Sequence, residues 1–193
     1  VALSPNLPDT HNNLGNALCA TGRVDEAITA CREAIRLKPN LAAAHTNLGN
    51  ALRDTGRVDQ AIAAYREAIR LEPNLAEAHY NLAQTYANLS QYSDAIREYR
   101  VATKLKTDDP DMYYDLGVAH TKLAQYDAAA AAFSKSLEID PDYYRAQDAL
   151  AEAREGVKRI RAGKKHQEDM LKKQKEEELK KAGLPVPAPT PKG

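Results

Sequence analysis

The sequence predicts an all-α solenoid, in which small helical units stack one after another instead of enclosing a single globular core. The composition agrees with this, because a chain of 193 residues with no Trp, one Phe and abundant Ala suits helices that pack closely. The main observation is a period of 34 residues. A leucine and an alanine each recur with it: Leu14, Leu48, Leu82 and Leu116, then Ala27, Ala61, Ala95 and Ala129.

The chain divides into units of equal length, and each unit is expected to hold two helices. In the second unit, Leu48 and Leu52 share one face of the first helix. Gly56 follows, a residue that tolerates the left-handed turn at a helix end, and Pro73 stops the second helix. The predicted repeats are 8–41, 42–75, 76–109 and 110–143.

Both ends of the chain depart from the repeat. Residues 1–7 read as the remnant of a preceding repeat, because Pro5 lies 34 residues before Pro39. Residues 144–182 begin like a fifth first helix and then become charged on nearly every side, so we expect a capping helix that continues as a charged, solvated helix. Residues 183–193 form a proline-rich tail.

The residues at matched places resemble the tetratricopeptide repeat. That family's pattern runs through a large residue, Leu, Gly, a second large residue, Ala, an aromatic residue, Ala and Pro. The second repeat supplies all of them: His45, Leu48, Gly49, Leu52, Ala61, Tyr65, Ala68 and Pro73. The other repeats match with substitutions, such as Cys31 at the aromatic place of the first and Thr107 at the proline place of the third. The resemblance implies a right-handed solenoid whose concave groove binds other proteins.

Amide side chains recur on the first helices, at places that face the concave groove in the tetratricopeptide family. A primary amide both donates and accepts hydrogen bonds, so a row of amides can pair with successive peptide groups of an extended ligand. Such a row resembles the asparagine ladder of O-linked N-acetylglucosamine transferases. The alternative is that the amides only solvate the groove. The row consists of Asn13, Asn47 and Asn81 with Asp115 next in line, then Asn16, Asn50 and Gln84 three residues later.

Two tyrosines, Tyr80 and Tyr114, are expected beside this row. Amphipathic rings with one polar tip are frequent binding anchors. Because Glu77, Asp111 and Asp115 should lie nearby, the C-terminal half of the groove is expected to prefer neutral or basic extended segments. The alternative for both tyrosines is a partly buried ring that packs on the neighbouring helix.

The sequence lacks the residue patterns expected for metal binding, for catalysis and for binding a C-terminal carboxylate. His11, His45 and His79 also recur every 34 residues. However, the first helices of adjacent repeats should lie on the order of 10 Å apart, and zinc ligands must each lie about 2.3 Å or less from the metal. The chain has no glycine-rich phosphate loop, HExxH or nucleophile elbow. We therefore expect no metal, no cofactor and no catalytic residue. The cations with which chaperone-binding members hold a C-terminal carboxylate are also absent, so a peptide of that kind is not expected.

Charge and hydropathy narrow the partners further. Residues 154–182 contain 11 Lys and Arg against 6 Asp and Glu, a surplus that suits an acidic partner. Residues 1–153 contain 15 Lys and Arg against 21 Asp and Glu, without the basic stripe that nucleic acid requires. No stretch is apolar for long enough to form a transmembrane helix. Two cysteines do not make a disulfide framework, which favours a reducing compartment such as the cytoplasm and leaves other compartments open.

From these residues we predict a non-catalytic scaffold or adaptor within a larger assembly, which binds an extended partner segment in its groove. The alternative is the substrate-recruiting region of an enzyme, such as a glycosyltransferase, whose catalytic part lies outside this chain.

Overall fold

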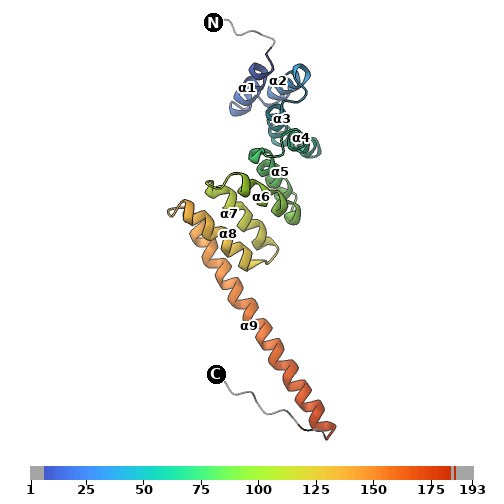
Figure 1. The fold of residues 1–193 in the computed structure, drawn as a ribbon, viewed down its shortest axis with the longest axis vertical. Helices are drawn as coiled ribbons and strands as arrows, with labels where there is room; N and C mark the ends of the chain where they lie inside the picture. The colour runs from blue at the N-terminus through green and yellow to red at the C-terminus, as the bar shows by residue number, and fades with distance from the viewer. Residues whose placement is uncertain (1–6, 184, 186–193) are drawn as a thin grey trace.

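The computed structural model describes residues 7–183 and 185, and all regular structure within them is α-helical (Figure 1). The predicted all-α solenoid is confirmed. Four helix pairs follow one another, and a much longer helix comes after them. The helices are α1 (Pro8–Ala20), α2 (Val24–Leu37), α3 (Ala42–Asp54), α4 (Val58–Leu71), α5 (Ala76–Asn88), α6 (Tyr92–Leu105), α7 (Pro110–Lys122), α8 (Tyr126–Ile139) and α9 (Tyr144–Lys181).

The pairs stack along one direction, and the first and second helices of the pairs lie on different sides of the stack (Figure 1). Each first helix, from α1 to α7, touches the first helix of the next pair, and α7 touches α9 in the same way. Over the described residues, no second helix touches the second helix of the next pair. The first helices therefore lie closer together, which means that they line the inner, concave side of a curved stack.

Small residues let the two helices of a pair approach each other. The recurring alanines are fully buried, and glycine provides further space on the first helices. Gly49 lies against the ring of Tyr65, where a Cβ atom would come within 2.5 Å of ring carbon Cε1. Gly117 lies against Phe133 in the same way. The aromatic residue of the second helix therefore packs directly on the backbone of the first.

The turn inside each repeat needs one residue with a left-handed backbone. Gly22 and Gly56 hold it in the first two repeats, with φ angles of 77° and 75°. Ser90 and Ala124 hold it in the third and fourth, at 59° and 55°. An L-residue in this region costs roughly 1–2 kcal/mol. The last two repeats therefore carry backbone strain at this turn.

Two of the recurring histidines, His45 and His79, bind the turns between repeats. Nε2 of His45 lies 2.9 Å from the carbonyl oxygen of Pro39, and Nε2 of His79 lies 3.1 Å from that of Pro73. In α9 the matching residue is Gln147, whose amide nitrogen donates to the carbonyl oxygen of Pro141 at 2.8 Å. His45, His79 and Gln147 thus recur because each binds the carbonyl oxygen of a proline at the end of the preceding repeat.

Helix α9 begins as part of the stack and ends outside it. Its residues Ala146, Leu150, Ala153 and Gly156 are buried. Beyond Val157 its described side chains are exposed, except that Leu179 is partly covered. The helix projects away from the repeats (Figure 1). Residues 1–6, 184 and 186–193 are not described, so the expected repeat remnant, apart from Leu7, and most of the proline-rich tail lie outside the described residues.

Candidate partner-binding groove

The inner helices α1, α3, α5 and α7 carry the amide row predicted from the sequence, and its exposure changes along the stack. Asn13 and Asn16 on α1 are exposed, and Asn47 and Asn50 on α3 are partly buried. Asn81 on α5 is only 8% exposed. Helix α5 has inner neighbours on both sides, α3 and α7, whereas α1 touches only α3 among the described inner helices. The open amides therefore lie at the N-terminal end of the groove.

Two of these asparagines already bind other side chains. The amide nitrogen of Asn47 donates to Oδ1 of Asn12 at 2.8 Å, which links α3 to α1. Oδ1 of Asn50 accepts a hydrogen bond of 2.7 Å from the hydroxyl of Tyr65. An amide has two donor hydrogens and two acceptor lone pairs, so both side chains keep capacity for a ligand.

The third and fourth repeats are joined by a polar cluster around Asp115. The hydroxyl of Tyr80 donates to Oδ2 of Asp115 at 2.8 Å, and the amide nitrogen of Gln84 donates to the same oxygen at 3.3 Å. The ring of Tyr80 lies 5.8 Å from that of Tyr99, measured between centroids. Tyr80 is therefore a partly buried ring that packs against the core, as in the alternative left open by the sequence, and its polar tip is held by the protein. Its role as a binding anchor stays a prediction.

The second predicted anchor, Tyr114, is covered by its neighbours. Its ring lies 5.6 Å from the ring of Phe133 and 5.5 Å from that of Tyr143. The guanidinium carbon of Arg145 lies 4.5 Å from the centre of the Tyr114 ring, a cation–π contact. Tyr143 also donates from its hydroxyl to Oδ1 of Asp111. Tyr114 is thus a packing residue for α8 and α9 as much as a groove residue.

The acidic side chains of this half of the groove include Asp111 and Asp115, and the charge of Arg145 acts on Asp115. Within the described chain, neither Asp111 nor Asp115 forms an ion pair with a Lys or Arg. Burial raises the pKa of Asp115, against the hydrogen bonds from Tyr80 and Gln84, which lower it. Burial, followed by the charge of Asp115, raises the pKa of Tyr80. The charge of Arg145 also lowers the pKa of Asp115, so this partly buried carboxylate has a cation nearby but no ion pair. A ligand cation at ion-pair distance would stabilise its charged form further.

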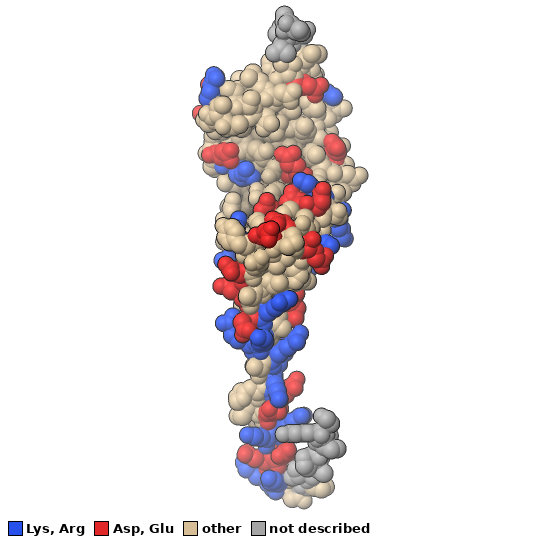
Figure 2. Space-filling model, turned by 90° about the vertical axis from the view of Figure 1, so that its left-hand side faces the viewer, with Lys and Arg blue, Asp and Glu red and all other residues tan. Residues whose placement is uncertain are grey.

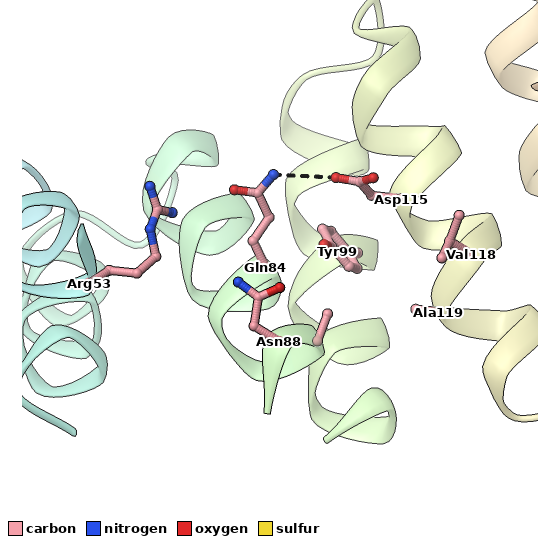
Figure 3. Close-up of a pocket in the computed structure, with 8 residues that line it drawn as sticks. Arg53, Gln84, Asn88, Tyr99, Asp115, Val118 and Ala119 are labelled. Carbon is pink, nitrogen blue, oxygen red and sulfur yellow. Dashed lines mark hydrogen bonds between the residues drawn. The ribbon is translucent and has the colours of Figure 1, made fainter. Parts of the chain in front are cut away.

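A hollow of about 380 Å³ opens next to Asp115, between inner helices α3, α5 and α7 (Figure 3). Figure 3 shows Gln84 bonded to Asp115 on one side and Arg53 on the other. The sequence did not single out Arg53, Asn88 or Tyr99, because Tyr99 occupies a family core place and the other two are not in the amide row. The lining residues are Arg53, Gln84, Ala87, Asn88, Tyr99, Asp115, Val118 and Ala119.

The remaining reactive side chains have structural surroundings. Cys31 is 0% exposed, and burial raises its pKa to about 12. His120 is 2% exposed and bonds to Gln125 at 2.6 Å. In the part of the chain that the structure describes, no three His, Cys, Asp or Glu side chains are grouped to hold a metal ion.

The projecting part of α9 forms a second polar surface. Figure 2 shows Lys and Arg side chains crowded along it, with acidic side chains between them. None of the described helices is long and apolar enough to cross a membrane.

Comparisons with known families identify the repeat. A model of the TPR repeat matches residues 15–56, 49–90 and 86–124, and a model of the tetratricopeptide repeat matches residues 110–143. These matches cover more than half of the chain, which therefore belongs to the tetratricopeptide repeat family. Proteins of this family typically mediate protein–protein interactions. The comparison with curated proteins finds no similar sequence.

Solved structures of several tetratricopeptide repeat proteins are similar to this one. A crystal structure of MamA protein has 27% sequence identity and a TM-score of 0.71, over 95% of this chain and 98% of that one. Cut9 in the APC/C hetero-tetramer Cut9–Hcn1 has 21% identity and a TM-score of 0.70, over 77% of this chain and 30% of the other. TTC0263, a thermophilic TPR protein of Thermus thermophilus, has 22% identity and a TM-score of 0.64, over 78% and 82%. The last two show the fold alone.

Proposed function

We propose that this chain is a non-catalytic scaffold or adaptor, which binds an extended segment of a partner protein in the groove lined by α1, α3, α5 and α7. The single observation that carries the proposal is the polar row on the inner helices. Within the described chain, the side chains of Asn13 and Asn16 make no hydrogen bond, and both residues are exposed. Amides spaced by the repeat suit the peptide groups of an extended chain, which present alternating donors and acceptors.

Membership of the tetratricopeptide repeat family supports the same class of function, because proteins of this family typically mediate protein–protein interactions. An extended partner segment would cross several repeats, and each repeat would add a contact without any enclosed pocket. The acidic residues around Asp115 give the C-terminal half of the groove a preference for neutral or basic segments.

A direct test uses peptides selected from a random library that is displayed on phage and panned against the full chain. The groove variant carries one change on each of three inner helices: Asn13→Ala, Asn47→Ala and Gln84→Ala. The matched control changes three residues of the outer helices, away from the groove: Thr29→Ala, Gln60→Ala and Ser93→Ala.

Fluorescence anisotropy then gives the dissociation constant of each labelled peptide. We expect the groove variant to bind at least about tenfold more weakly, because each lost hydrogen bond contributes about 0.5–1.5 kcal/mol. The outer variant should bind like the original chain. Equal affinities for the original chain and the groove variant would reject the groove as the binding site.

A substrate-recruiting role in a glycosyltransferase-like enzyme is the second candidate. The observation that favours it is the segment Asn-Leu-Gly-Asn-Ala-Leu, which occurs at 13–18 and again at 47–52. The row differs from a continuous ladder in that Asn81 is buried and Asp115 takes the next place. Partners that co-purify with the chain separate the two candidates, since recruitment to an enzyme requires a glycosyltransferase among them.

The basic part of α9 is proposed as a separate contact for an acidic partner. Removal of residues 158–193 should abolish binding of such a partner and leave the groove peptides unaffected, because the buried face of α9 ends at Gly156. Loss of groove-peptide binding in this variant would show that α9 takes part in the groove instead.

A further inference from the structure

One tyrosine in the core has a hydroxyl group without a protein partner. In the second repeat, the hydroxyl of Tyr65 donates to Asn50 on the inner helix of its own repeat. Tyr99 occupies the same place in the third repeat and is only 2% exposed, yet none of the described residues bonds to its hydroxyl. The residue that matches Asn50 is Gln84, and its amide nitrogen is bonded to Asp115 instead.

The hydroxyl of Tyr99 opens into the hollow beside Asp115. Among the described residues, no side-chain nitrogen or oxygen is both sealed from solvent and without a hydrogen bond. The Tyr99 hydroxyl has no hydrogen bond, so it is the atom that solvent reaches. The hollow that Tyr99 lines therefore receives this hydroxyl (Figure 3). Burial, followed by the charge of Asp115, raises the pKa of Tyr99, which fits a hydroxyl near that carboxylate.

A single residue explains why the third repeat differs from the second. A Cβ atom at Gly49 would lie 2.5 Å from Cε1 and 2.7 Å from Cδ1 of Tyr65, distances at which the ring would have to move. The matching residue in the third repeat is Ala83, which has such a Cβ atom and is 0% exposed. Tyr99 therefore cannot lie where Tyr65 lies, and its hydroxyl is kept from the partner that Tyr65 uses.

The other side of this site is the carboxylate of Asp115. Both protein donors, Tyr80 and Gln84, bond to Oδ2, so Oδ1 keeps its full capacity to accept hydrogen bonds. Arg53, across the hollow, pairs with Asp54 at 3.5 Å. Asp115 and Tyr99 both line the hollow of about 380 Å³, so the second carboxylate oxygen and the hydroxyl offer two acceptors to one incoming donor group.

We infer that this hollow is a side-chain subsite of the groove, and that it takes a basic side chain, foremost arginine, from the extended partner segment. The inference rests on the proposed groove function and adds its specificity. A guanidinium group is planar and presents several N–H donors in a fixed fork, so it donates to Asp115 and to Tyr99 at the same time. An ammonium group of lysine satisfies the charge of Asp115 with less geometric fit.

The site occurs once in the described array. The first repeat has Cys31 at the tyrosine place, and the fourth has Phe133, neither with a hydroxyl. In the second repeat the hydroxyl of Tyr65 is already bonded. One basic residue in the partner, at a fixed distance from its other contacts, would therefore set the register of the bound segment along the groove.

The test uses the library-selected peptides against the full chain. Peptides that bind the groove should show arginine, and less often lysine, enriched at one position. Replacing that arginine by citrulline, which keeps the shape and removes the charge, should weaken binding by at least about tenfold, as expected for a lost hydrogen bond to a charged group. Tyr99→Phe, which the Phe133 of the fourth repeat shows to be compatible with the fold, should also weaken binding of the arginine peptide. It should leave the citrulline peptide nearly unchanged.

Two aspartates on α7 provide the matched pair of variants. Asp115→Asn should remove the preference for arginine over citrulline, whereas Asp111→Asn, the same change of charge outside the hollow, should keep it. An equal loss in both variants would overturn the inference, because a general negative potential would then explain the preference. Groove-binding peptides without an enriched basic position would also overturn it while leaving the proposed function intact. Peptides that bind the groove variant as tightly as the original chain would overturn the proposed function itself.

Discussion

Gly49→Ala tests the close packing between the two helices of a repeat. The added Cβ atom would lie 2.5, 2.7 and 2.9 Å from three carbons of the Tyr65 ring. Ordinary contact begins at about 3.4 Å, so the ring must move by about 1 Å. Tyr65 is 0% exposed and its hydroxyl bonds to Asn50 at 2.7 Å, so the ring cannot move without a loss.

The expected magnitude combines three contributions. Overpacking costs about 1–3 kcal/mol, and the lost hydrogen bond of Tyr65 costs about 0.5–1.5 kcal/mol. The better helix propensity of Ala over Gly returns about 1 kcal/mol. We therefore expect Gly49→Ala to lower the free energy of unfolding by about 1–3 kcal/mol. Each kcal/mol lowers the Tm by about 2–4 °C for a chain of this size.

Urea denaturation followed by circular dichroism measures this change. The matched control is Gly163→Ala in the exposed part of α9, where nothing lies within 4 Å of the added Cβ atom and no loss is expected. Tyr65→Phe provides a second check, because it should cost about 1 kcal/mol in the original chain and almost nothing in the Gly49→Ala background. A Gly49→Ala chain as stable as the original would refute the packing of Tyr65 on the inner helix.

Three further predictions concern four substitutions. His79→Ala should destabilise the chain more than His45→Ala, since His79 bonds to Glu98 as well as to a turn carbonyl. The bond from His79 lowers the pKa of Glu98, so Glu98 stabilises the fold at neutral pH. Urea titrations should show that this stability is lost as the pH falls through the lowered pKa. Ala124→Gly should raise the Tm and increase the free energy of unfolding by roughly 0.5–1 kcal/mol. Glycine removes the left-handed strain at this turn, and the greater freedom of the unfolded glycine chain offsets part of that gain. Asp115→Asn should raise the Tm at neutral pH, and because burial raises the pKa of Asp115, this gain should shrink as the pH falls through that pKa. An unchanged Tm for the last two variants at neutral pH, or equal losses for the two histidine variants, would contradict these accounts.

The repeat itself was predictable because it is written in every unit. Leucine, alanine and aromatic residues recur at fixed places, so helix type and packing face follow from the period. The expected distance between repeats also argued against a shared metal ion on the recurring histidines. Their bonds to the turn carbonyls were not foreseen, since Pro39 and Pro73 approach the histidines only after the chain has turned.

The sequence indicated which residues lie on the inner helices, but not how exposed they are or which hydrogen bonds they form. Tyr80 and Asp115 are 35 residues apart, and their bond depends on how α5 and α7 pack. Asn13 and Asn81 have the same place in the period but opposite exposure, because α5 lies inside the stack and α1 at its end. The hollow beside Tyr99 depends on Ala83, which stands where the other repeats have Gly. The sequence shows this substitution, but its effect on Tyr99 follows only from the close contact between Gly49 and the Tyr65 ring.

Hydrogen exchange of the full chain, with and without a selected peptide, tests the central claim most directly. Binding in the concave groove should slow amide exchange in the inner helices α3, α5 and α7, which face the peptide, with little change in the outer helices α4, α6 and α8. Slower exchange confined to the outer helices, or to the projecting part of α9, would contradict the assignment of the concave groove as the partner-binding surface.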